Sequence, residues 1–337
     1  SVDEPNQADL IILNTCHIRE KAAEKIYSEL GRLKKINLNS ERNTKVAVAG
    51  CVGQAEGQEI IKRSPIVDLV FGPLTYHQLP EMLDEIETRP GQPSKKLVNI
   101  DIPEEDKFLQ LKDSRKNLKS ISSLLSVQEG CDKFCSFCVV PYTRGVEISR
   151  PAKQILNEAQ ELIDIGAKEI ILLGQNVNAW SQSNGKDTDM TFAQLINEIS
   201  ELNIERIRYI TSHPRDMTEG LMRAHRDIEK LQPYLHLPVQ SGSDKILKEM
   251  NRNYSSQEYI DIIDKTREYK QDIAISGDFI VGFPGETDDD FEATLDIVKR
   301  VKYAHAYSFK YSPRPGTPAA LKDCLLYTSD AADEHGC

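Results

Sequence analysis

The stretch Cys131-Asp132-Lys133-Phe134-Cys135-Ser136-Phe137-Cys138 places three of the chain's seven cysteines on one short segment. It follows residues 124–128, whose apolar pattern is typical of a buried strand. In parallel α/β sheets, reactive groups sit in loops beyond the carboxyl ends of the strands. The segment therefore predicts a reactive loop at the beginning of an α/β domain.

The spacing C-x3-C-x2-C indicates which chemistry this loop serves. Three closely spaced thiolates can hold three irons of a cubane cluster, and no other Cys or His is near enough in sequence to be a local fourth ligand. One iron would then be open to a small molecule. The alternative is a zinc site, which usually takes four protein ligands at paired short spacings. An odd total of seven cysteines also fits ligation better than a set of disulfides.

Downstream of the loop, apolar strand patterns alternate with helical patterns. The predicted strands are residues 124–128, 169–173, 206–211, 234–237, 274–281 and 305–311. The predicted helices are residues 152–165, 192–202, 256–269 and 288–301. Six such strands predict a partial (β/α)6 barrel over residues 121–322, too short for a complete eightfold barrel.

Upstream of the loop, a second α/β domain is expected over residues 1–88. Its predicted elements are strands at 8–15, 46–50 and 67–71, the first covered on both faces, and a helix at 19–35. Alternation of these elements indicates a doubly wound parallel sheet. Residues 89–120 contain Pro90, Gly91 and Pro93 and are predicted to be a connector.

Two further cysteines, Cys16 and Cys51, each follow a predicted strand of this first domain. Because parallel strands end at the same edge of a sheet, their thiols are expected to converge on a shared site. The alternative for each cysteine alone is a small buried apolar side chain.

The loop, with the aromatic Phe137 before its last cysteine, resembles that of the radical S-adenosylmethionine (SAM) enzymes. The resemblance implies that Cys131, Cys135 and Cys138 bind a [4Fe-4S] cluster whose open iron binds the amino and carboxylate groups of SAM. Reduction of that cluster cleaves SAM to methionine and a 5′-deoxyadenosyl radical. The protein supplies binding and exclusion of water, and the cofactor supplies the radical.

Within that superfamily, the segments around Cys16 and Cys51 resemble the N-terminal domain of the methylthiotransferases, where three cysteines hold an auxiliary [4Fe-4S] cluster. Only Cys16 and Cys51 match, so the auxiliary site is one ligand short in this chain. The stretches similar to the MiaB branch, within a resemblance over roughly 8–322, are residues 14–22, 138–145, 174–178, 211–214, 236–243 and 311–318. The RimO branch, which modifies a ribosomal protein, usually differs at the first and third of these and remains an alternative.

The MiaB resemblance implies an enzyme that converts N6-isopentenyladenosine at position 37 of tRNA to its 2-methylthio derivative. One SAM donates a methyl group and another provides the radical that activates carbon 2 of the base. The implied partners are the tRNA anticodon loop and an electron donor such as flavodoxin or ferredoxin. A monomeric cytoplasmic protein is expected, and no apolar run approaches the roughly 20 residues needed to span a membrane.

Both ends of the chain depart from the family pattern. The chain begins near the second strand of the family's first domain, and residues 323–337 replace the expected small β-barrel RNA-binding domain. This tail resembles translated sequencing-adapter read-through, so it is expected to be disordered, with no role for Cys324 or Cys337. We expect a chain truncated at both ends that cleaves SAM but inserts sulfur poorly or not at all.

Other residues are candidates for the cofactor site or the tRNA. Gly282 and Gly285 allow close approach of backbone to SAM, although a plain strand-to-helix turn would use the same residues. Gln240 and Ser241 are candidates to hydrogen-bond SAM, with a helix N-cap as the alternative for Ser241 or Ser243. Weaker candidates, more often structural, are His213, His236, Arg144, Arg150, Arg215 and Arg314.

The net charge of −11 argues against a protein that coats nucleic acid non-specifically. Residues 19–45 nevertheless carry eight basic and four acidic side chains, enough for a modest tRNA-facing patch or for a solvated helix face. The run Asp288-Asp289-Asp290 is expected to cap a helix N-terminus. A non-catalytic zinc- or cluster-binding module is the rival function from another class.

Overall fold

The chain folds as two units. A computed structural model describes residues 2–17, 20–38, 44–87, 95–102, 108, 120–183 and 189–322. The first unit consists of Ser1–Lys112 and Val139–Gly145, and the second of Asp113–Cys138 and Val146–Cys337. A short helix that follows the cysteine loop, α5 (Val140–Arg144), therefore belongs to the first unit. Residues 323–337, which the sequence sets apart as a tail, lie outside the described residues.

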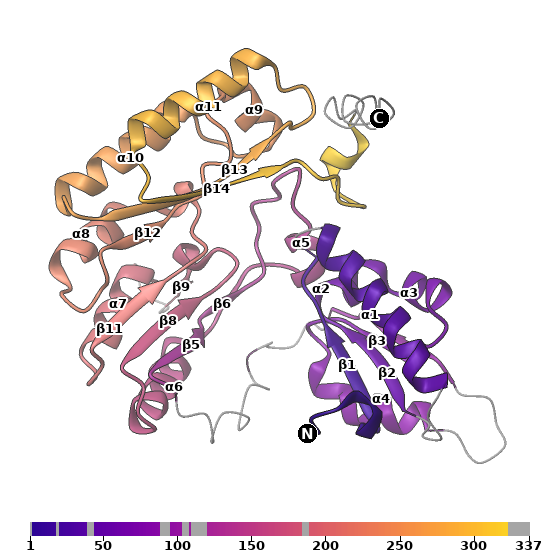
Figure 1. Cartoon of the computed structure of the whole chain (residues 1–337). Helices are drawn as coiled ribbons and strands as arrows, with labels where there is room; N and C mark the ends of the chain where they lie inside the picture. Colours follow the sequence, from indigo (N-terminus) through magenta and orange to yellow (C-terminus); the bar gives the residue numbers. More distant parts are fainter. Residues whose placement is uncertain are drawn as a thin grey trace. The chain divides into compact units, whose positions relative to one another are not determined.

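A four-stranded parallel sheet in the order β1-β2-β3-β4 forms the first unit (Figure 1). Its strands are β1 (Leu10–Asn14), β2 (Lys45–Ala49), β3 (Leu69–Phe71) and β4 (Leu97–Asn99). Its helices are α1 (Glu20–Leu38), α2 (Cys51–Glu56), α3 (Gln58–Arg63) and α4 (Leu79–Ile86).

Successive residues of β2 point to opposite faces of this sheet and enter two separate apolar cores. Val46 and Val48 pack with Leu30 of α1 and Ile60 of α3. Ala47 and Ala49 pack with Met82 and Ile86 of α4 on the other face. Helices on both faces confirm the predicted doubly wound parallel sheet.

One expectation for the first unit was confirmed and another was wrong. Strand β1 packs Leu10 on the core of one face and Ile11 and Leu13 on the core of the other, as expected, although Ile12 is 38% exposed. Strand β4 lies inside the range predicted as a connector and pairs with β3 from Leu69↔Leu97 to Phe71↔Asn99. The first unit therefore extends beyond residue 88. The sequence does not predict this strand, because three residues give almost no periodic signal.

The second unit contains the predicted six parallel strands. They are β5 (Ser122–Ser126), β8 (Glu169–Leu173), β11 (Arg206–Tyr209), β12 (Tyr234–His236), β13 (Ala274–Val281) and β14 (His305–Lys310). They form two sheets, β11-β8-β5 and β12-β13-β14, and a parallel bridge between Ile207 and Leu231 links β11 to the segment before β12. Short antiparallel pairs join β6 (Gln128–Glu129) to β7 (Ile148–Ser149) and β9 (Ser181–Gln182) to β10 (Met190–Thr191).

Helices cover one side of these strands, as expected for a partial (β/α)6 barrel (Figure 1). They are α6 (Ala152–Asp164), α7 (Phe192–Ser200), α8 (Glu219–Asp227), α9 (Asp244–Glu249), α10 (Ser256–Tyr269) and α11 (Asp288–Val301). One continuous apolar core joins strand residues such as Ile170 and Ile207 to helix residues such as Leu195 and Ile263. The N-cap of α11 is Thr287, which forms a capping box with Asp290, so the acidic run follows the cap and is structural.

A buried histidine makes the stability of this barrel depend on pH. His225 of α8 is 1% exposed and hydrogen-bonds the Tyr209 hydroxyl at 2.7 Å. Burial lowers the pKa of His225 from 6.5 to about 4, so only the unfolded state binds this proton between those values. Stability is therefore expected to fall by about 3 kcal/mol as the pH drops from 6.5 to 4.

This expectation can be checked with a variant that does not titrate. In urea unfolding at pH 7 and pH 4, His225→Gln should lose less free energy of unfolding than the wild-type chain. An equal loss in both proteins would show that other groups determine the acid sensitivity.

Candidate functional site

The cysteine loop lies beyond the carboxyl ends of strands β5 and β6, where the sequence predicts it. Cys135 is buried, and Cys131 and Cys138 are partly exposed. The Ser136 amide donates to the Met250 carbonyl at 3.0 Å, and its hydroxyl donates to the Glu249 carbonyl at 2.8 Å. The loop is thus fixed to the end of α9 by the residue between two cysteines.

Two residues outside the predicted site complete this attachment. Asn251, at φ 58°, donates its side-chain amide to the Lys133 and Phe134 carbonyls at 3.3 and 2.9 Å. The Arg252 guanidinium lies 3.4 Å from the Cys135 sulfur. An αL-prone Asn beside a basic residue is a sequence signal, but only the fold shows that it faces the cysteines.

The three thiols are close enough to affect one another electrostatically. The pKa of Cys131 is raised to about 12, mainly by burial and in part by the neighbouring Cys135 and Cys138. A hydrogen bond with the Lys133 backbone acts in the opposite direction. A thiol in this state is protonated at neutral pH and loses its proton when it ligates a metal. Soft thiol donors of this kind suit iron–sulfur clusters.

No three His, Cys, Asp or Glu side chains converge closely enough to hold a single metal ion in the described ranges. A structural zinc site usually takes four protein ligands, whereas the loop supplies three cysteines. A cubane cluster places separate irons between its cysteines, so the three thiols of the loop fit it as a donor set.

Buried polar atoms at the same end of the barrel fit a polar small molecule. Within the described residues, hydrogen-bond partners are lacking for Asn176 Oδ1, Ser212 Oγ, His213 Nε2 and Glu286 Oε1. Asn176 follows strand β8, Ser212 and His213 follow β11, and Glu286 follows β13. Buried polar groups without partners are rare and need an explanation such as a missing ligand or water.

The five predicted SAM-binding residues occupy different surroundings. Phe137 packs against the small core formed by Ile246, Met250, Phe283 and Ala319. Ser241 is fully buried, and its hydroxyl contacts Thr294 and accepts from the Ser243 amide. These two side chains hold the loops together, and Ser243 is the N-cap of α9.

The other three lie where backbone is turned sharply. Gln240 has φ 78° and pairs through its backbone with Asp278 and Ile280 at the end of β13. Gly282 and Gly285 have φ 70° and 83°, conformations that favour glycine. These three positions lie near the carboxyl end of β13.

The weaker histidine and arginine candidates are mostly in structural contacts. His236 contacts Ser276 Oγ at 3.0 Å, and Arg150 pairs with Glu158. His213 is buried and accepts from the Arg215 amide at 3.2 Å. Arg314 contacts Ser312 Oγ at 2.7 Å. Of the basic patch, Arg19 and Arg42 lie outside the described residues.

The first unit brings Cys16 and Cys51 together, as expected from their strand ends. Cys16 follows β1, Cys51 begins α2, and their side chains are hydrogen-bonded to each other. That hydrogen bond lowers the pKa of Cys51 against the opposing effect of burial, and Arg144 and Thr143 of α5 lower it further. Two thiols and a guanidinium thus form a second candidate site.

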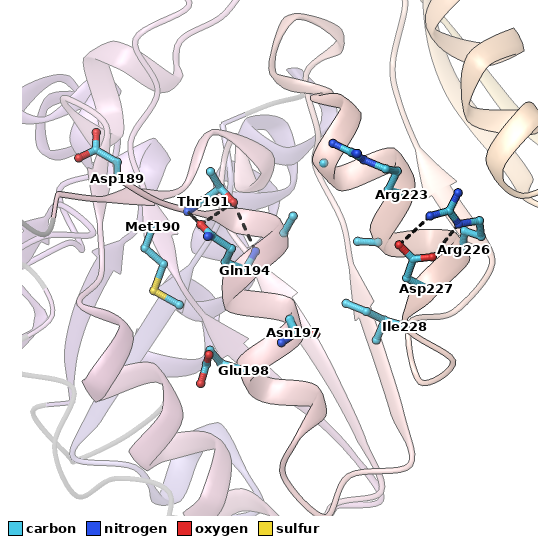
Figure 2. Close-up of a pocket in the computed structure, with 13 residues that line it drawn as sticks. Asp189, Met190, Thr191, Gln194, Asn197, Glu198, Arg223, Arg226, Asp227 and Ile228 are labelled. Carbon is cyan, nitrogen blue, oxygen red and sulfur yellow. Dashed lines mark hydrogen bonds and ion pairs between the residues drawn. The ribbon is translucent and has the colours of Figure 1, made fainter. Parts of the chain in front are cut away.

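A groove of about 930 Å³ between α7 and α8 is a separate feature (Figure 2). It is lined by polar side chains such as Gln194, Arg223 and Arg226, and Arg226 pairs with Asp227 at 2.6 Å. Neither cysteine nor histidine is among its described lining residues. Its lining also includes Met190 and Thr191 of β10, and none of its lining residues belongs to the cysteine loop.

Comparison with known families and structures agrees with this geometry. The radical SAM superfamily matches residues 125–298, and the uncharacterized protein family UPF0004 matches residues 1–72. The solved structure of the radical S-adenosylmethionine methyltransferase TsrM from Kitasatospora setae aligns with a TM-score of 0.64 at 14% identity, over 93% of this chain and 64% of that one. The cobalamin-dependent radical enzyme OxsB aligns with a TM-score of 0.59 at 17% identity, over 97% of this chain and 48% of that one. These two likenesses concern the fold.

Sequence relatives are much closer. A protein of Ruegeria sp. (strain TM1040) named tRNA-2-methylthio-N(6)-dimethylallyladenosine synthase is 59% identical over 318 residues, which are 94% of this chain and 70% of that protein. Proteins of the same name from Bartonella henselae and Agrobacterium fabrum are 56% and 55% identical, over 94% of this chain. The chain therefore belongs to the radical SAM superfamily and, within it, to the family of the tRNA-2-methylthio-N(6)-dimethylallyladenosine synthases.

Proposed function

We propose that this chain is a radical SAM methylthiotransferase that converts N6-isopentenyladenosine at position 37 of tRNA to its 2-methylthio derivative. The observation that carries the proposal is the cysteine loop at the carboxyl end of the first barrel strand. The chain that contains it is 59% identical to a protein named tRNA-2-methylthio-N(6)-dimethylallyladenosine synthase. An adenosine in the anticodon loop is single-stranded, so it can be splayed into a pocket without opening a duplex.

In this proposal, Cys131, Cys135 and Cys138 hold a [4Fe-4S] cluster. Bound there with SAM, such a cluster supplies reductive cleavage of SAM to methionine and a 5′-deoxyadenosyl radical. The protein's own part is to hold the loop through Ser136 and Asn251 and to present polar groups at the barrel end. Phe137 contributes by packing, and Gln240, Ser241, Gly282 and Gly285 shape the loops beside SAM.

Cys16 and Cys51 are proposed to hold part of the auxiliary [4Fe-4S] cluster that carries the sulfur. Their mutual hydrogen bond and the nearby Arg144 support this role, because a positive charge stabilises thiolate ligands. The expected third cysteine has no counterpart among the positions of this sequence that match the family.

The proposed partners and location follow from the same chemistry. Reductive cleavage needs an electron donor, for which flavodoxin or ferredoxin is suitable, and a monomer in the cytoplasm is proposed. None of the helices in the described ranges has the length and apolar character required for a membrane span.

The substrate is tested by mass spectrometry of nucleosides from tRNA. A strain that lacks its own synthase and expresses this chain should contain 2-methylthio-N6-isopentenyladenosine, which is detectable at low yield. Methylthiolation of a ribosomal protein, with tRNA unchanged, would instead identify a RimO-like enzyme. Resemblance at residues 14–22 and 174–178 favours the tRNA.

Cys51→Ala is expected to separate SAM cleavage from sulfur transfer. Formation of 5′-deoxyadenosine should persist, while methylthiolated nucleoside per 5′-deoxyadenosine should fall by at least about tenfold, because a ligand of the second site is lost. Liquid chromatography of both products from one reaction measures this ratio. Cys324→Ala, in the tail, is the matched control, and an unchanged ratio in Cys51→Ala would remove Cys51 from the sulfur site.

A further inference from the structure

Arg252 is a buried arginine whose surroundings are unusual for its charge. It is 5% exposed and lies between α9 and α10. Its guanidinium donates to the Pro238 carbonyl at 2.7 Å and to the Tyr254 hydroxyl at 2.8 Å, and its third nitrogen lies 3.4 Å from the Cys135 sulfur. All its nitrogens therefore have partners, but two of those partners are neutral oxygens.

In the part of the chain that the structure describes, no carboxylate forms an ion pair with Arg252. By contrast, Lys133 of the cysteine loop pairs with Asp216 at 2.8 Å. Arg150, equally buried, pairs with Glu158. Because a buried charge without a counter-charge is costly, the partner of Arg252 must be sought among the groups that it already contacts.

The neighbouring side chains leave one group that can become negative. The Tyr254 hydroxyl donates to the Val239 carbonyl at 2.8 Å, so it keeps its proton. His213 stacks edge-to-face on Tyr254 at 5.8 Å and is neutral. Cys135 remains, and its thiol becomes a thiolate when it ligates iron.

We propose that Arg252 is a positioning residue for the cluster held by the loop, which places a fixed positive charge against the Cys135 sulfur and favours the reduced cluster. The inference rests on the function proposed above. On ligation, the Cys135 thiol loses its proton to solvent and binds iron as thiolate. A one-electron reductant then adds one negative charge to the cluster, and a nearby cation stabilises that product more than the oxidised form.

The backbone around Arg252 supports a positioning role. Asn251 and Asn253, on either side, have φ 58° and 55°. Residues 249–251 make four hydrogen bonds to the cysteine loop. The Glu249 and Met250 carbonyls accept from Ser136, and the Asn251 side chain donates to two carbonyls of the loop. The guanidinium is thus held against Cys135 by the same segment that fixes the loop.

The test measures the midpoint potential of the cluster in the chain after anaerobic reconstitution with iron and sulfide. Electron paramagnetic resonance detects the reduced cluster at a series of potentials set with dithionite. In Arg252→Gln, the ratio of reduced to oxidised cluster at one fixed potential should fall about tenfold, equivalent to about 59 mV for one electron. Arg252→Lys keeps the charge and should remain within about twofold of wild type. Arg150→Gln, the matched control at a buried arginine with its own carboxylate, should lose thermal stability without changing the ratio.

Each outcome decides the question. An unchanged ratio in Arg252→Gln, or an equal fall in Arg252→Lys and Arg252→Gln, would overturn the charge role. If Arg252→Gln folds but retains no iron, full iron in Arg252→Lys supports the proposal and loss from both contradicts it. If Arg252→Gln does not fold, a wild-type ratio in Arg252→Lys supports it and a tenfold fall contradicts it. Failure of the wild-type chain to assemble any cluster would instead contradict the proposed function.

Discussion

Replacing Cys135 by alanine is expected to abolish reductive cleavage of SAM, with a fall of at least about 100-fold in 5′-deoxyadenosine, or about 2.7 kcal/mol of lost transition-state stabilisation. Cys135 is the buried member of the three cysteines and the one in contact with Arg252. Without its thiol, the loop has two ligands where three irons need three. Anaerobic assays of methionine and 5′-deoxyadenosine measure the loss.

The control for this prediction is Cys324→Ala, which removes a cysteine that the sequence analysis expects to have no role. Its SAM cleavage and iron content should equal those of the wild-type chain. Undiminished cleavage in Cys135→Ala would rule out the cysteine loop as the cluster site.

Gly242→Ala is expected to lower the free energy of unfolding by about 3 kcal/mol. A Cβ at this position would lie 2.3 Å from the Ala293 carbonyl oxygen and 2.6 Å from the Thr294 Cα, both of them backbone atoms of α11. Backbone cannot move aside as a flexible side chain can, so α11 or the loop of Gln240 and Ser241 must shift. Thermal unfolding should therefore occur about 6–12 °C lower.

Gly220→Ala provides the comparison within the same unit. A Cβ there meets only Thr218 Oγ1 at 3.9 Å and the Ala193 Cβ at 4.0 Å, which are ordinary contacts. Because alanine is the better helix former in α8, stability should be unchanged or slightly higher. Equal unfolding temperatures for the two variants would show that the loop at Gly242 is not closely packed on α11.

The barrel strands could be predicted from sequence because each combines an apolar run with clear boundaries. Strand β8 is observed over Glu169–Leu173, as predicted, between Gly166 and Gly174. Strand β4 was missed because Leu97–Asn99 is three residues long and is stabilised by pairing with β3 rather than by a pattern of its own. The exposure of Ile12 depends on strand order, which periodicity does not contain.

The site divides in the same way. Cys131, Cys135 and Cys138 are close in sequence, so their grouping needs no knowledge of the fold. The meeting of Cys16 and Cys51 followed from the rule that parallel strands end at one edge. Arg252 and Asn251 were missed because each contacts the loop across 117 residues or more. Contacts between residues so far apart in sequence become visible only in the folded chain.

The most direct test of the central claim is product analysis of the wild-type chain after anaerobic reconstitution with iron and sulfide. With dithionite and SAM, we predict the absorption of a cubane cluster together with methionine and 5′-deoxyadenosine in equal amounts. A chain that binds zinc or a cluster but leaves SAM intact under these conditions would be a metal-binding module, and the assignment of a radical SAM enzyme to this chain would be contradicted.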